Sequence, residues 1–332
     1  MRAVRIVLAA WTAAALLAAQ SGLGFLNHNR PVLDAHNCYP YDGRWQDRID
    51  RALASGSPVS IEQDLTWYVD PASSAGRIVV THRAEADGSE PTLQSYFFER
   101  VRPIVEQALR DNDRARWPLI ILHFDFKSHS PPLLHAVWEL LGQYEGWITT
   151  ARQTVSPREL APFEAKPILV VTEDSDEQEE VFFRQVPAGA KLRLFGSAHT
   201  APIPGSSREE RAHNAARLPP DKLLTEHPTN YRRWWNNSWS VVEEGGPPRA
   251  GDWTAADRSR LEALVKRAHQ LGFWIRFYTL DGFPAGDDHG WDDGYNFGSL
   301  DAARIRWRAA IAAGVDFVAT DQYEDLAKEM GH

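Results

Sequence analysis

Short apolar runs rich in β-branched residues alternate with longer amphipathic stretches along most of the chain. The runs predict eight strands, at residues 32–36, 59–65, 119–126, 168–172, 192–196, 235–242, 273–280 and 315–320, and a short extra strand at 78–82. Apolar residues at three- and four-residue spacing predict helices at 93–110, 133–141, 178–186, 255–271 and 300–313. Thr254 and Gly272 are suited to cap the helix at 255–271. This alternation is typical of a parallel sheet wrapped by helices.

Eight strands with intervening helices favour a closed (β/α)₈ barrel of the TIM type, in the α/β class. A doubly wound open sheet is the alternative. Segments 202–220 and 243–251 are rich in proline and glycine and predict long loops. No interdomain linker stands out, so we expect one barrel domain over residues 22–332.

The first 21 residues have the pattern of a signal peptide. Arg2 and Arg5 precede an apolar run at 6–19, and small residues around Ala18, Ala19 and Ser21 offer cleavage sites. A retained membrane anchor is the alternative, but the run is shorter than the roughly 20 apolar residues that a spanning helix needs. We therefore expect a secreted or periplasmic protein.

Composition narrows the class of partner. The formal net charge is −9, and loss of Arg2 and Arg5 with the leader brings it to −11. Such a chain lacks the clustered basic residues of a nucleic-acid footprint, so no nucleic-acid partner is expected. With 43% hydrophobic residues it can bury a full core. Cys38 is the single cysteine, which excludes an intrachain disulfide.

Polar residues gather where the first predicted strands end, which is where barrel enzymes place their chemistry. His36-Asn37 ends the first strand, Glu62-x-Asp64 lies in the second, His82-Arg83 ends the extra strand, and Asp125-x-Lys127 ends the third. Because alternate residues share a face, Glu62 and Asp64 point the same way. Two such carboxylates need positive charge nearby, which a hard divalent cation with oxygen ligands supplies.

This set of residue types suits cleavage of a phosphodiester. The reaction needs a base for the attacking oxygen, an acid for the leaving oxygen and positive charge for the transition state. Two histidines, a lysine and a carboxylate-bound ion supply those functions.

The order His36-Asn37, Glu62-x-Asp64, His82, Asp125-x-Lys127 resembles that of the phospholipase C-like phosphodiesterase superfamily. The superfamily includes glycerophosphodiester phosphodiesterases, phosphatidylinositol-specific phospholipases C and the sphingomyelinase/phospholipase D toxins. The segment from Gly314 to Asp321 is similar to the last strand of glycerophosphodiesterases.

The resemblance implies roles for single residues. His36 and His82 would be the acid and base in either order, and Lys127 would contact the phosphate. Glu62, Asp64 and Asp125 would bind Mg²⁺ or Ca²⁺. The resemblance also implies attack by a neighbouring hydroxyl of the substrate, which gives a cyclic phosphodiester.

The motifs fit the superfamily better than any one of its branches. Glycerophosphodiesterases usually have arginine at the position of Asn37, glutamate at that of Asp125, and often aspartate at that of Arg83. Asp-x-Lys looks more like the toxin branch, and His-Asn appears among phosphatidylinositol-cleaving members. We expect a phospholipid or glycerophosphodiester substrate, transient contact with a membrane surface, and a monomer.

Further residues at predicted strand ends are candidates for substrate binding. They are Asn37, Arg83, Glu173, His199, Trp235 and Tyr278. Two other functions compete with the phosphodiesterase. A secreted glycoside hydrolase would use two carboxyls and no metal, which leaves the histidines and Lys127 unexplained. A non-catalytic barrel that binds lipid or glycan would need neither catalytic carboxyls nor a metal.

Overall fold

The computed structural model describes residues 31–41, 44, 46–284, 286–287 and 293–331. The expected signal peptide at 1–21 lies outside these residues. Within the described part of the chain, no helix is both long and apolar enough to span a bilayer.

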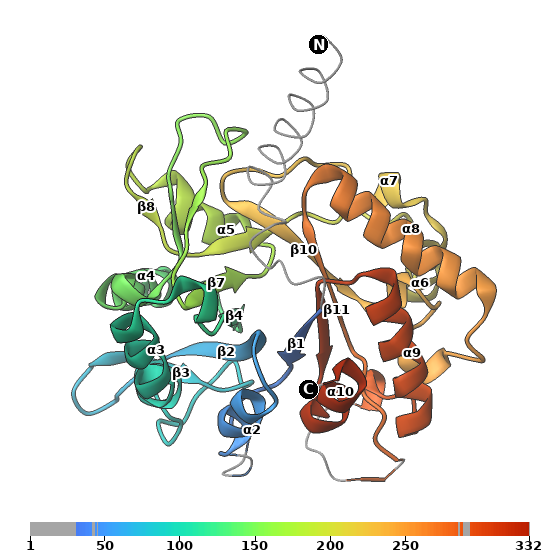
Figure 1. The fold of residues 1–332 in the computed structure, drawn as a ribbon, viewed down its shortest axis with the longest axis horizontal. Helices are drawn as coiled ribbons and strands as arrows, with labels where there is room; N and C mark the ends of the chain where they lie inside the picture. Colours follow the sequence, from blue (N-terminus) through green and yellow to red (C-terminus); the bar gives the residue numbers. More distant parts are fainter. Residues whose placement is uncertain (1–30, 42–43, 45, 285, 288–292, 332) are drawn as a thin grey trace, which may run out of the picture.

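Eight parallel strands close into a barrel (Figure 1), as the sequence predicts. In order around the barrel they are β1 (Val32–Ala35), β2 (Val59–Val69), β4 (Ile120–Phe126), β7 (Ile168–Thr172), β9 (Phe195–Ser197), β10 (Arg232–Ser238), β11 (Trp274–Tyr278) and β12 (Phe317–Thr320). Strand β1 pairs with both β2 and β12, with Asp34 opposite Ser60 on one side and Ala319 on the other. This double pairing closes the sheet and excludes the open alternative.

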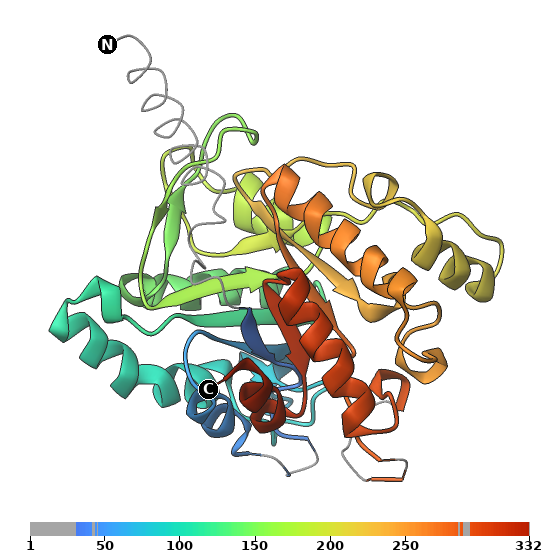
Figure 2. The ribbon, with the colours of Figure 1, turned by 45° about the vertical axis from the view of Figure 1, so that its right-hand side comes forward.

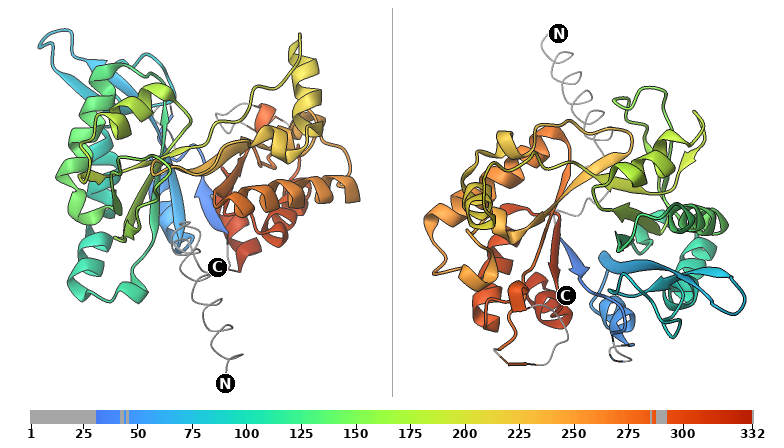
Figure 3. Two further views of the ribbon diagram at one scale, coloured as in Figure 1. Left: turned by 90° about the horizontal axis from the view of Figure 1, so that it is seen from above. Right: turned by 180° about the vertical axis from the view of Figure 1, so that it is seen from behind.

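Helices cover the outside of the barrel (Figure 2), and Figure 3 shows α3 and α4 on the opposite side from α8 and α9. The α-helices are α2 (Arg48–Ala54), α3 (Glu99–Asp111), α4 (Pro131–Gln143), α5 (Asp176–Glu179), α6 (Arg208–Arg217), α7 (Pro220–Leu223), α8 (Ala255–Leu271), α9 (Leu300–Ala313) and α10 (Tyr323–Met330). The π-helical turns are η1 (Gln94–Phe98) and η4 (Glu180–Arg184), and the 3₁₀ turns are η2 (Arg114–Arg116), η3 (Glu145–Trp147), η5 (Trp239–Val241), η6 (Pro247–Arg249) and η7 (Asp293–Tyr295). The predicted caps of α8 are confirmed: Thr254 forms a capping box, and Gly272 takes the left-handed conformation at φ 96°.

Three predicted segments differ from the structure. The run at 192–196 is divided, because Leu192 pairs in a separate antiparallel sheet and the barrel strand starts only at Phe195. The strand predicted at 235–242 starts at Arg232 and ends at Ser238, whose side chain accepts from the Ser240 amide and caps the turn η5. The loop predicted at 202–220 contains α6, whose N-cap is the Ser207 hydroxyl.

A small antiparallel sheet was not predicted. It comprises β5 (Thr150–Arg152), β6 (Phe163–Glu164) and β8 (Lys191–Leu192), in the order β6-β5-β8. These strands have only two or three residues each, which is too short for an alternating pattern to stand out.

The predicted extra strand is present as β3 (Gly76–Val80), which pairs antiparallel with the far end of β2. Leu65 faces Val80, and the Thr81 amide donates to the Asp64 carbonyl at 3.0 Å. We call β2 beyond Leu65, the turn at 70–75 and β3 together the β2–β3 arm. The arm brings His82 back to the end of the barrel.

The barrel interior changes character along its axis. Near the strand N-termini, Trp234, Trp274 and Phe317 are buried in ring-to-ring contact. Farther along the strands, the buried interior positions carry Asp34, Glu62, His123 and Arg276. The rings of Trp234 and His123 meet edge to face, at the boundary between the aromatic layer and the polar layer. A polar floor therefore lies directly beneath the C-terminal end of the barrel.

Candidate functional site

Three carboxylates meet at the ends of β2 and β4. Asp64 and Asp125 are register partners on the neighbouring strands, and Glu62 lies two residues before Asp64 on the same face. One oxygen from each of the three lies within 4.8 Å of the others. Glu62 and Asp64 are buried, and Asp64 Oδ1 has no hydrogen-bond partner. All the available ligand atoms are oxygens, and Asp64 Oδ1 makes no other contact by hydrogen bonding. This set fits a hard divalent cation such as Mg²⁺ or Ca²⁺.

Lys127 follows β4 and joins two of these carboxylates. Its Nζ lies 2.8 Å from Asp64 Oδ2 and 2.7 Å from Asp125 Oδ2. Burial works against the charged amine, but Asp64 and Asp125 outweigh it and raise the pKa of Lys127. The ammonium group is therefore a fixed positive charge at the edge of the carboxylate trio.

His36 follows β1 and is oriented by a carboxylate from the last strand. Its Nδ1 lies 2.8 Å from Asp321 Oδ1, while its Nε2 lies 3.8 Å from Glu62 Oε1. Asn37 Nδ2 donates to both Asp321 oxygens at 3.2 Å and holds that carboxylate in place. Burial disfavours the imidazolium, but Glu62 and Asp321 overcome this and raise the pKa of His36 to about 9.

His82 is oriented in the same way by a carboxylate of the trio. Its Nδ1 lies 2.7 Å from Asp64 Oδ2, and its side chain is 48% exposed, whereas that of His36 is 7% exposed. A carboxylate at Nδ1 fixes the ring and leaves Nε2 available for proton transfer. Each histidine thus has its own orienting carboxylate.

A buried phenol connects the two histidines. Tyr39 OH donates to Asn37 Oδ1 at 2.6 Å and lies 3.2 Å from His82 Nδ1. Since Asn37 also holds Asp321, the chain of contacts runs from His36 through Asp321, Asn37 and Tyr39 to His82. The structure therefore places Asn37 behind the site as a support.

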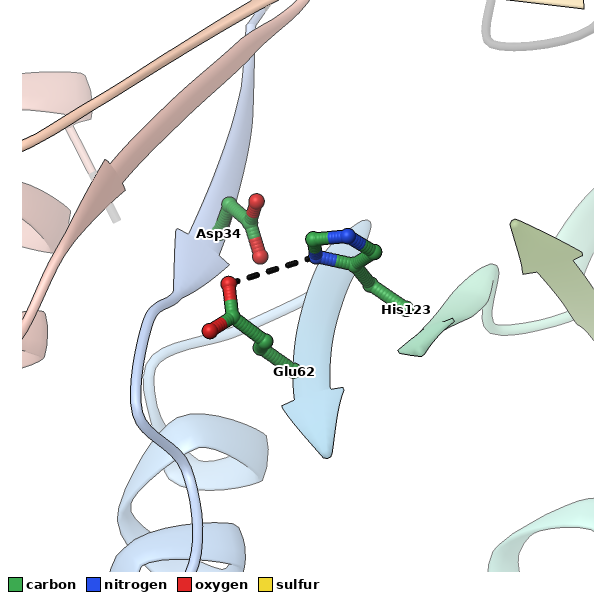
Figure 4. A group of neighbouring side chains, drawn as sticks. All are labelled: Asp34, Glu62 and His123. Carbon is green, nitrogen blue, oxygen red and sulfur yellow. Dashed lines mark ion pairs between the residues drawn. The ribbon is translucent and has the colours of Figure 1, made fainter. Parts of the chain in front are cut away.

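Beneath the trio lies the polar floor, part of which is shown in Figure 4. Arg276 in β11 donates to Asp34, to Glu62 Oε2 at 2.5 Å and to Asn236 Oδ1 at 3.0 Å. His123 Nδ1 lies 3.3 Å from Glu62 Oε2. Asp34, Glu62 and His123 come close enough to share a cation, and the guanidinium of Arg276 already lies between the two carboxylates.

The floor continues toward β7 and β10. His123 Nε2 lies 2.7 Å from Glu173 Oε1, and Asn236 Nδ2 donates to both Glu173 oxygens. Burial and Arg276 oppose a charge on His123, but Glu173 and Glu62 raise the pKa of His123 to about 9. The predicted residue Glu173 is thus part of the site, bound to its floor.

The other predicted residues lie in different surroundings. Tyr278 stacks on His36 with ring centroids 6.2 Å apart, so it belongs to the site. His199 pairs with Asp174 at 2.6 Å, in a cluster that also includes Arg232. Arg83 lines a cavity of about 540 Å³ together with Tyr41, Thr81 and Tyr96. Trp235 is fully buried, and its indole donates to Thr200, so the structure does not bring it to the site.

A second cavity, of about 570 Å³, adjoins the His36 side of the site. Tyr295 connects them, since it lines the cavity and its ring lies 5.4 Å from that of His36. The residues Ser238, Ser240, Thr279, Arg208 and Arg249 also line it. Thr279 has φ 68°, an uncommon conformation for a β-branched residue and one that clusters at functional sites.

Sequence reasoning did not place several residues of this site. Asp34 and Arg276 are charged residues inside strands, and the pattern shows only that each needs a buried partner. Tyr39 lies in the loop after β1, where no periodicity marks it. The carboxylate at Asp321 directly follows a predicted strand, which is the signal that links it to the site.

Comparison with known proteins adds structural likenesses. No family model matches the chain, and no curated protein matches it. It is similar to a glycerophosphoryl diester phosphodiesterase from Parabacteroides distasonis, at 13% identity and a TM-score of 0.42, over 91% of this chain and 86% of that chain. It is also similar to a calcium-dependent phosphoinositol-specific phospholipase C from Pseudomonas sp., at 14% identity and a TM-score of 0.43, over 89% and 90%.

The HPPK-DHPS of Plasmodium falciparum gives a similar score. One of its structures has 7% identity and a TM-score of 0.43, over 91% of this chain and 47% of that chain. Because barrels of different function score alike, we take the reaction from the side chains of the site.

Proposed function

We propose that this protein is a metal-dependent phosphodiesterase that cleaves a phospholipid or a glycerophosphodiester. The observation that carries the proposal is the pair of histidines, each oriented through Nδ1 by its own carboxylate, beside the trio of Glu62, Asp64 and Asp125. A glycoside hydrolase would use two carboxyls directly and would have no use for the two oriented imidazoles or for Lys127.

The carboxylate trio would hold Mg²⁺ or Ca²⁺, which supplies positive charge for the phosphoryl oxygens and the attacking oxygen. Lys127 donates to a non-bridging phosphate oxygen from the edge of the trio. Its amine is already held in place by Asp64 and Asp125, so little reorganisation is needed when charge develops.

Proton transfer is assigned to the histidines. In its neutral form, which the raised pKa of about 9 makes more abundant at higher pH, His36 takes the proton of an attacking hydroxyl, and His82 gives a proton to the leaving oxygen. Asp321 and Asp64 keep the two rings in fixed orientations, and Asp321 also stabilises the charged form of His36. Asn37 and Tyr39 hold the two pairs in a fixed relation.

The attacking hydroxyl is proposed to belong to the substrate and to neighbour the phosphate. A tethered hydroxyl has a high effective concentration, and its attack releases the leaving alcohol and forms a cyclic phosphodiester. The cavity of about 570 Å³ on the His36 side has room for the part of the substrate that carries this hydroxyl.

A panel of phosphodiesters tests the proposal, assayed with Mg²⁺, with Ca²⁺ and with excess EDTA. We expect cleavage that stops in EDTA and returns with metal. Full activity in EDTA would show that the carboxylates serve no cation. Phosphorus NMR during turnover should show the cyclic product, and rapid cleavage of a substrate with that hydroxyl methylated would rule out this route.

A further inference from the structure

Arg276 is a buried arginine with more acidic partners than it needs for its own charge. It is 2% exposed and lies inside the barrel on β11. Its guanidinium donates to Asp34 and also to Glu62 Oε2 at 2.5 Å. Pairing with Asp34 alone would balance the charge, so the second carboxylate requires a different explanation.

The contact divides the two oxygens of Glu62 between two tasks. Oε2 is held by Arg276 and lies 3.3 Å from His123 Nδ1, whereas Oε1 faces His36 Nε2 at 3.8 Å. A carboxylate held by one oxygen cannot rotate freely, and an arginine fork fixes orientation better than a single-point cation does. Arg276 therefore determines which of its two oxygens Glu62 offers to a cation bound together with Asp64 and Asp125.

The same contact reduces the negative charge that the trio offers to a cation. Arg276 adds a positive charge next to Glu62, in addition to that of Lys127, which pairs with Asp64 and Asp125. Both basic side chains are held by the fold, Arg276 at Glu62 and Lys127 at Asp64 and Asp125. A divalent ion bound there would experience repulsion from each of them, and buried charges are weakly screened.

We propose that Arg276 is a positioning residue that orients Glu62 and weakens the affinity of the carboxylate trio for its divalent cation. Arg276 thereby lowers the affinity for the cation but holds Glu62, one of the cation's ligands, in the correct orientation. This inference rests on the proposed function for the presence of a cation and a phosphodiester substrate. Asp34 serves to keep the guanidinium in place from below.

The matched pair of variants is Asp34→Asn and the double variant Asp34→Asn/Arg276→Met. Both remove the Asp34–Arg276 ion pair, but only the double variant takes the guanidinium away from Glu62. Replacing both Asp34 and Arg276 with neutral groups of similar shape leaves neither of these two as an unpaired buried charge, and Glu62 keeps its contact with His123. Mn²⁺ serves as the probe, with its Kd measured by electron paramagnetic resonance without substrate, and kcat and KM measured at saturating metal.

In the double variant we expect Mn²⁺ to bind about tenfold more tightly, because a nearby buried positive charge is gone. We expect kcat to fall by about tenfold or more with KM little changed, because a mispositioned ligand affects the chemical step. Asp34→Asn should stay within about threefold of wild type in both quantities, because the asparagine oxygen can still accept from Arg276 and keep the guanidinium beside Glu62. Tighter binding together with slower turnover is a combination that general loosening of the fold does not produce.

Arg276→Lys separates charge from geometry and supports the test if the double variant does not fold. It keeps the positive charge but loses the fork, so Mn²⁺ affinity should stay near wild type while kcat falls. Unchanged kcat in this variant would overturn the orienting role. Equal Mn²⁺ affinity in the single and double variants would overturn the effect on affinity. If the wild-type protein bound no Mn²⁺ and cleaved no phosphodiester, the proposed function itself would be the failure.

Discussion

Two arginines are equally buried in this barrel but have opposite surroundings. Arg233 and Arg276 are each 2% exposed. Arg233 in β10 donates to neutral acceptors, namely the Asn230 and Ala161 carbonyls and the Asn230 side chain, and lies over the Phe163 ring. Arg276 donates to two carboxylates and one amide.

The difference shows in their pKa values. Burial lowers the pKa of Arg233 to about 10. Burial also acts against the charge on Arg276, but Asp34 and Glu62 raise its pKa above the usual value. Arg233 thus ties backbone segments together at a cost in desolvation, whereas the charge of Arg276 is compensated by two carboxylates. A buried charge is a clue to function when its partners are charged groups that reach the site.

Arg276 differs from Arg233 in function only if the carboxylates above Arg276 bind a cation. Replacing Asp64 with Asn should abolish divalent-cation binding and lower kcat by about a thousandfold or more, because the ion supplies several kcal/mol of stabilisation to the transition state. Calorimetric metal titration and a phosphodiester assay check this. If the variant retained either activity or cation binding, Asp64 would not be a ligand of a catalytic cation.

The histidines are the next test, because they connect the charged floor to the substrate. His36→Ala and His82→Ala should each lower kcat by about 10²–10⁴-fold with an alkyl leaving group. A p-nitrophenyl ester needs no proton on its leaving oxygen, so it should restore most of the activity of His82→Ala and little of that of His36→Ala. If the ester instead restored the activity of His36→Ala, His36 would be the acid and His82 the base.

Arg233→Met should act on the fold alone. We expect it to destabilise the protein by about 2 kcal/mol, because buried carbonyl and amide acceptors lose their donor. The Mn²⁺ Kd should be unchanged. Urea unfolding and the metal titration used for Arg276 measure the two effects, and a shift in Kd would show that the two arginines are not functionally distinct.

Arg249 extends the comparison to an exposed arginine. It lines the cavity beside His36 together with Arg208, and no ion pair is formed by either guanidinium in the described part of the chain. Arg249→Ala should raise KM by about twofold to fivefold for substrates with a second anionic group, since exposed charge pairs contribute about 1 kcal/mol or less. Zwitterionic headgroups provide the control, and an equal change for both would indicate a steric effect.

The smallest expected effect concerns a histidine far from the site. A hydrogen bond to Asp316 at 2.8 Å raises the pKa of His269 above 6.5. The pair therefore stabilises the fold fully below about pH 6.5 and loses its contribution as pH rises through the folded pKa. His269→Gln should cost about 1 kcal/mol or less at about pH 6, and less at about pH 9. An equal cost at both pH values would indicate packing.

Much of the fold follows from the sequence, because long elements carry clear periodicity. Helices α8 and α9 start and end at the predicted residues, and the barrel strands β7 and β12 are close to prediction. The failures are short elements. Strands of two or three residues and the helix α6 depend on pairing and capping that no apolar pattern reveals.

The site divides in the same way. Glu62, Asp64 and Asp125 come together as expected, because strand alternation and parallel register place them on one face. The contacts of Tyr39 with His82 and of Arg276 with Glu62 join segments far apart in the chain. Such contacts depend on barrel closure and loop path, which residue type alone does not determine.

The β2–β3 arm has a consequence for recognising related chains. Eighteen positions separate Asp64 from His82, yet the contact between them is set by the pairing of Leu65 with Val80. The turn at 70–75 is largely exposed, so residues added or removed there would leave that pairing unchanged. A search pattern for such sites should therefore fix the strand pairing and let the count of intervening residues vary, because a rigid spacing would discard chains that build the same pair of side chains from a longer or shorter arm.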